Sequence, residues 1–142
     1  MIEQDYQHLI CLTLDTDPDG LSGKTANRSD MSLAGLHYVM QTWADALNIL
    51  GLQVPMTWFI RADDQIADGF GDSTHLLQTY ASFWSARLQA GDELGWHPHI
   101  YEKRDDDYHI NKADNFVLPA LERTWHDLQQ TPFSLRSVRM GE

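Results

Sequence analysis

Short apolar segments alternate along the chain with longer amphipathic ones, and this alternation constrains the fold more than any other feature. The short segments have the length of strands, and the longer ones place apolar residues three and four positions apart, as helices do. An order of strand, helix, strand repeated in this way requires a parallel sheet with crossover helices. The strand candidates are residues 8–14, 54–60, 93–96 and 135–140.

Three helices are expected between these strands. The first follows Ser32 as its N-cap and ends before Gly51, and the second ends before Gly91. The third carries Leu118, Leu121, Trp125 and Leu128, and the charged stretch that precedes it, residues 102–107, is expected to be a loop.

Four βα units make about half of a closed (β/α) barrel. The last predicted strand has no helix after it, and half a barrel would leave strand edges and apolar faces uncovered. The expected fold class is therefore α/β, with parallel βα repeats forming about half of a distorted barrel. We expect residues 1–142 to be one domain that is truncated at its C-terminal side.

Composition narrows the classes of partner. The net charge of −11 disfavours nucleic acids and anionic lipid surfaces, and the hydrophobic content of 42% is enough for a core. No apolar stretch approaches the ~20 residues of a membrane span, and a secretory leader is lacking, so a cytoplasmic location is expected. Cys11 lies in an apolar run and is expected to be buried. A homo-oligomer is compatible with the sequence.

Carboxylates leave the end of the first predicted strand. Asp15 and Asp17 are two positions apart, so continued strand geometry sends both to the same side of the sheet. Asp19 is a third candidate. Residues 17–20 also read as a simple turn, because Asp, Pro and Gly are favoured turn residues.

Histidines leave the end of the third predicted strand. His97 and His99 are separated by Pro98, which stiffens an extended segment in which both rings face the same way. Since the carboxyl ends of parallel strands meet at one edge, Asp and His side chains should converge there. These are ligand types suited to zinc or a similar divalent ion with an open position for water. Elsewhere in the chain the histidines are expected to be structural or solvated.

Four segments resemble, in order and spacing, the motifs of the polysaccharide deacetylases that share the NodB homology domain. The resemblance implies a distorted (β/α) barrel that holds a divalent metal with one Asp and two His. It implies that Asp17 and His97 bind the metal, that Asp15 acts as the base and that Arg139 orients it. The segments are residues 12–17, 57–59, 92–99 and 137–141.

Two positions depart from the family pattern. The second histidine of the family lies four positions after the first, where this chain has Tyr101, so either His99 or Tyr101 completes the metal site. The family also takes a catalytic histidine acid from a late strand, which would lie beyond Glu142.

The expected function is a metal-dependent deacetylase that hydrolyses an N- or O-acetyl group on a carbohydrate, acting on carbon–nitrogen bonds other than peptide bonds. One alternative is a hydrolase of a small non-sugar amide. Another is a catalytically incomplete fragment that binds a metal or a carbohydrate. A serine hydrolase is disfavoured because no Gly-x-Ser-x-Gly motif occurs.

Overall fold

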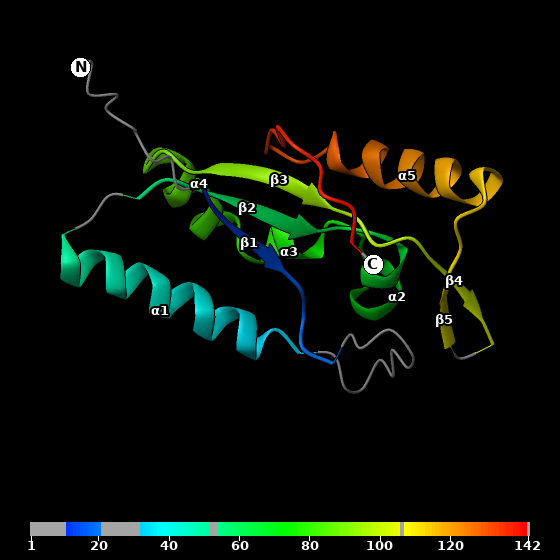
Figure 1. Ribbon diagram of the computed structural model, residues 1–142, viewed down its shortest axis with the longest axis horizontal. Coiled ribbons are helices and arrows are strands. Elements are labelled where there is room, and N and C mark those ends of the chain that lie inside the picture. The colour runs from blue at the N-terminus through cyan, green and yellow to red at the C-terminus, as the bar shows by residue number, and fades with distance from the viewer. Residues whose placement is uncertain (1–10, 21–31, 52–53, 106, 142) are drawn as a thin grey trace, which may run out of the picture.

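The computed structural model describes residues 11–20, 32–51, 54–105 and 107–141. It is a mixed α/β structure in which helices accompany a small parallel sheet, and a two-stranded hairpin projects from one end (Figure 1). The elements are β1 (Leu12–Thr16), α1 (Ala34–Leu50), β2 (Met56–Arg61), α2 (Asp64–Phe70), α3 (His75–Thr79), α4 (Ala81–Gln89), β3 (Glu93–His97), β4 (Tyr101–Arg104), β5 (Asp107–Ile110) and α5 (Asp114–Leu128).

The sheet has the strand order β1-β2-β3, and both pairings are parallel. The parallel sheet predicted from the alternation is therefore confirmed, while the half barrel stays a prediction. Thr16 locks the first pairing, because its buried hydroxyl donates to the Phe59 carbonyl at 3.2 Å and accepts from the Arg61 N–H at 3.1 Å. In this register Asp15 lies beside Phe59, and Arg61 lies beside His97.

The core lies on one face of the sheet. Trp58 is 0% exposed and meets the rings of Phe83 and Trp84 edge-on at centroid distances of 5.3 and 5.7 Å. Its indole N–H donates to the Asp92 carboxylate at 2.6 Å, so a buried polar group of the core is satisfied by another. Alternate residues of the strands, such as Phe59, belong to the opposite face, from which the candidate functional side chains emerge.

All three strands of the sheet end later than the sequence prediction, β2 at Arg61 and β3 at His97, and β2 also begins later, at Met56. β1 continues through Asp15 to Thr16 instead of ending at Leu14, because its pairing with β2 extends that far. Its predicted start at residues 8–10 lies outside the described part of the chain. Cys11 is exposed, so its predicted burial is wrong; the register places it just before β1, where the sheet no longer covers it.

The second predicted helix is divided into α3 and α4. The chain leaves helical geometry at Tyr80, with φ −106° and ψ 25°, and resumes at Ala81. α2 was not predicted from the sequence. It begins at an Asp63 N-cap and ends at Gly71, whose φ of 88° suits glycine.

The described residues of the charged stretch, 102–105 and 107, belong to a β-hairpin, so the loop prediction is wrong there. β4 and β5 pair antiparallel around a turn that includes Asp105 at φ 56°. Charged residues are compatible with these strands because they lie largely at the solvent-facing surface. Tyr108 is buried and donates its hydroxyl to Asp68 of α2, and Lys103 pairs with the same carboxylate at 2.6 Å.

The C-terminal segment, residues 135–141, runs beside β3. It forms a single parallel bridge from Val138 to Trp96, and the Trp96 N–H donates to the Ser137 carbonyl at 2.8 Å. The predicted fourth strand over residues 135–140 is therefore in the expected place but is not a regular strand, since the ladder is limited to that bridge. Among the described residues, no helix combines the length and apolar character needed to cross a bilayer.

Candidate metal centre

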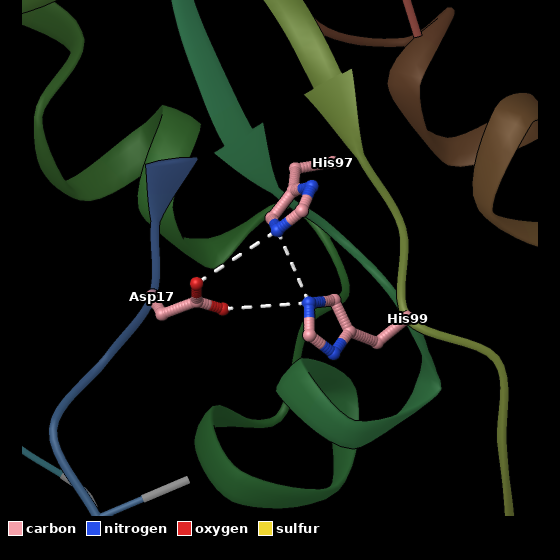
Figure 2. A group of neighbouring side chains, drawn as sticks. All are labelled: Asp17, His97 and His99. Atoms are coloured by element: carbon pink, nitrogen blue, oxygen red, sulfur yellow. Dashed lines mark hydrogen bonds and ion pairs between the residues drawn. The ribbon is translucent and has the colours of Figure 1, made fainter. Parts of the chain in front are cut away.

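Two strands bring three candidate ligands to one edge of the sheet. Asp17 follows β1, His97 is the last residue of β3, and His99 lies two residues further on. Their ligand atoms all lie within 4.8 Å of one another and point toward a common space (Figure 2). The two Nε2 atoms are 3.1 Å apart, and each lies 3.7 to 3.8 Å from an Asp17 oxygen. This group could hold a metal ion.

The ring of His97 is oriented for ligation by its second nitrogen. Nδ1 lies 2.8 Å from the carbonyl oxygen of Arg139, which can only accept a hydrogen bond. In the neutral ring Nδ1 therefore carries the proton, and the lone pair of Nε2 faces Asp17 and His99. A backbone carbonyl that fixes the tautomer is the usual companion of a metal-ligating histidine.

His99 is held at its backbone and kept neutral. Its N–H donates to the Asp63 carboxylate at 3.1 Å. Burial, and after it the positive charge of Arg61, lower the pKa of His99 to about 4. The imidazole is then unprotonated near pH 7 and competes little with protons for a metal. The close Nε2 contact is satisfied when His99 donates to His97, and a bound cation would take the place of that proton.

Arg139 reaches from the C-terminal segment across the sheet to Asp15. Its guanidinium binds Asp15 Oδ1 at 2.8 Å and Thr13 Oγ1 at 2.9 Å. On the way it lies over the Phe59 ring, with 4.1 Å between the guanidinium carbon and the ring centroid. The other oxygen of Asp15 faces His97 Nε2 at 4.0 Å, so this carboxylate borders the three-ligand group.

Gly95 leaves room for this arrangement. A Cβ at this position would approach the Phe59 ring and Ser137 Oγ to 2.7 Å. We therefore expect Gly95→Ala to displace Phe59 or the C-terminal segment and to lower the free energy of unfolding by ~1–3 kcal/mol. Urea denaturation checks this, with the exposed Ala90→Ser as a control that should leave the midpoint unchanged. Equal midpoints for the Gly95→Ala variant and the unmodified protein would contradict the packing.

Two further candidates from the sequence have different places. Asp19 lies at the start of α1, where its carboxylate accepts the Gly35 N–H at 2.7 Å, and it is not in the ligand group. Tyr101 lies beside His99 with 5.6 Å between ring centroids, while His99 itself contributes the nitrogen of the group.

Sequence reasoning missed Arg61. Its side chain is 1% exposed, and its Nη1 lies 2.6 Å from Asp17 Oδ1. Nε and Nη2 of the guanidinium donate to the side chains of Asp63 and Gln65. The sequence did contain a signal, because an arginine at the end of an apolar strand is followed two positions later by Asp63. Parallel topology places this strand between the two strands that lead to the ligands.

A cavity of about 560 Å³ adjoins the centre. It includes Gly141, which packs so closely on the His99 ring that a Cβ there would overlap the imidazole. Neither this cavity nor a larger one of about 700 Å³ is lined by Asp17, His97 or His99, but the smaller one includes Gly141, which contacts the His99 ring, and is therefore nearer to the centre. The smaller cavity is lined by Ile100, Ile110, Asn111, Lys112, Asp114, Val117, Met140 and Gly141.

The donor set fits a catalytic rather than a closed structural site. One carboxylate and two imidazoles leave a coordination position for water, and a second carboxylate borders them. This combination suits metal-assisted hydrolysis. Comparison with known protein families, with curated proteins and with solved structures found no match.

Proposed function

We propose that the protein is a metal-dependent hydrolase that removes an N- or O-acetyl group from a carbohydrate, in the manner of the polysaccharide deacetylases it resembles. The observation that carries the proposal is the convergence of Asp17, His97 and His99. Asp15 lies beside them and forms an ion pair with Arg139. The order of the motifs along the chain adds support. The proposal includes a parallel sheet that is part of a distorted (β/α) barrel.

Each side chain has a role that its contacts support. A divalent ion, with zinc as the first choice for this donor set, would supply Lewis acidity that lowers the pKa of water from ~15.7 toward ~7. Asp15 would accept the proton of the attacking water at Oδ2, because Arg139 binds Oδ1 and fixes the carboxylate. His97 and His99 contribute ring nitrogens, and Asp17 contributes a negative charge that would balance the cation.

The cavity supports a second candidate, hydrolysis of a small non-sugar amide. Its walls include the aliphatic side chains of Ile100, Ile110 and Val117 and also polar ones, and none of the described residues that line it is aromatic. Sugar faces commonly stack on aromatic rings, whereas an apolar amide fits an aliphatic wall. A panel of chitooligosaccharides and cyclic ureide-type amides separates the two candidates by their relative kcat/KM.

The role of Asp15 provides the sharpest test. We expect Asp15→Asn to retain metal stoichiometry but to lower the rate of acetate release by ~10²–10⁴-fold, because a general base contributes about that much. Metal analysis and a coupled acetate assay measure the two properties separately. Asp107→Asn, an exposed change in β5, is the matched control and should leave both properties unaltered. A metal-loaded protein that is inactive on acetylated sugars and on the amides would reject the hydrolase proposal.

A further inference from the structure

β2, the middle strand of the sheet, supplies none of the three candidate ligands, yet residues at its end contact ligand residues that follow both neighbouring strands. β2 lies between β1, which leads to Asp17, and β3, which carries the histidines. Arg61 is the last residue of β2, and Asp63 follows two positions later as the N-cap of α2. Both side chains are buried.

Arg61 is fixed by three acceptors. Its guanidinium binds Asp17 Oδ1 at 2.6 Å through Nη1, Asp63 through Nε and Gln65 through Nη2. A buried charge is tolerated only when its donors are matched in this way, so the direction of the guanidinium is strongly determined. One oxygen of Asp17 is thereby held, which leaves Oδ2 facing His97.

Asp63 connects Arg61 to the segment that follows β3. Its Oδ1 accepts the N–H groups of Gln65 and Ile66 at 3.0 Å each, which fixes the carboxylate at the start of α2. Its Oδ2 accepts from Arg61 and from the backbone N–H of His99 at 3.1 Å. One ion pair therefore contacts Asp17 from β1 and the segment after β3.

We propose that Arg61 and Asp63 are positioning residues for the metal centre: the pair holds Asp17 and His99 in ligating geometry and thereby sets the metal affinity. The inference rests on the metal centre of the proposed function but not on its reaction or substrate. Partners that orient metal ligands typically change affinity by ~10–100-fold when they are lost.

Arg61→Lys separates positioning from charge. Lysine keeps the positive charge but lacks the planar fork that reaches Asp17, Asp63 and Gln65 together. If geometry sets the affinity, this variant binds Zn²⁺ ~10–100-fold more weakly than the unmodified protein. If only the charge matters, the two proteins bind Zn²⁺ equally. Titration against a chelator of known affinity measures the difference.

Arg87→Lys is the matched control. Arg87 pairs through Nε with the buried Asp92 at 2.6 Å, so the same substitution alters an arginine–aspartate pair that has no contact with the ligand group. We expect its Zn²⁺ affinity to equal that of the unmodified protein. Absorption spectra of the Co²⁺-loaded proteins add a readout of geometry, and they should change for Arg61→Lys alone.

Gln65→Met is the second variant, for use if the Arg61→Lys protein does not fold. Gln65 Nε2 has no hydrogen-bond partner in the part of the chain that the structure describes, so the change removes only the contact from Oε1 to Arg61. A reduced Zn²⁺ affinity and an altered Co²⁺ spectrum would support the proposal. Unchanged affinity and spectrum would overturn it.

The outcomes distinguish this inference from the proposed function. Weaker binding by Arg61→Lys together with no hydrolysis by any metal-loaded protein supports the positioning pair and rejects the hydrolase. Hydrolysis by the metal-loaded protein together with an unchanged Zn²⁺ affinity of Arg61→Lys supports the hydrolase and rejects the positioning pair. Failure of the unmodified protein to bind Zn²⁺ or Co²⁺ overturns both.

Discussion

Replacing Asp17 and His97 together with alanine is expected to abolish stoichiometric binding of a divalent metal. The double change removes two of the three ligand atoms that lie within 4.8 Å of one another. Each single change should already weaken binding by more than ~100-fold, since losing a ligand costs more than the ~10–100-fold that follows from losing a group that only orients one. Elemental analysis of the dialysed proteins and calorimetric titration with Zn²⁺ measure the effect.

The control for this experiment alters the same residue types away from the centre. Asp107 and His109 are exposed on β5, so their joint replacement by alanine should leave metal stoichiometry unchanged. A metal content that survives the loss of Asp17 and His97 would eliminate this site. Equal losses in the control protein would instead indicate binding that is not specific to the centre.

Trp58→Ala is expected to produce the largest loss of stability. The side chain is 0% exposed and packs on Phe83 and Trp84. Truncating a buried tryptophan costs ~3–5 kcal/mol of unfolding free energy, and the buried carboxylate of Asp92 also loses the indole donor. Because many domains have a total stability of only ~5–15 kcal/mol, we expect folded variant to be recovered mainly at low temperature.

Trp125→Ala is the corresponding control at the surface. Trp125 is 44% exposed on α5, so its loss should shift the urea midpoint by much less than the loss of Trp58. The comparison keeps the chemical change constant and varies burial, together with the hydrogen bond from Trp58 to Asp92. Similar midpoints for the two variants would contradict the assignment of the core to the face that carries Trp58.

The parallel sheet could be predicted because its signal is local. Each strand is an apolar run bounded by polar residues, and alternation with helices dictates parallel pairing. Once the strands are parallel, side chains that follow their carboxyl ends share an edge, which is why Asp17, His97 and His99 could be grouped from sequence alone.

The missed features depend on contacts between distant residues. Arg61 looks like an isolated charge until the register of β2 places it beside His97 and within reach of Asp17. Residues 102–107 are all charged and carry no apolar alternation, so the sequence pattern favours a loop there. The stability of the hairpin comes partly from the side chain of Tyr108, which anchors on α2.

The contacts of Arg139 with Asp15 and His97 also bear on the order in which the chain folds. Its contact with Asp15 joins residues 124 positions apart, and its carbonyl selects the tautomer of His97. A chain emerging from the ribosome exposes Asp15 and Asp17 long before the segment that completes their surroundings. Contacts of such long sequence separation form late and slow the folding of a domain. A nascent chain should therefore complete the surroundings of Asp15 and His97 only after its final described residues have docked beside β3.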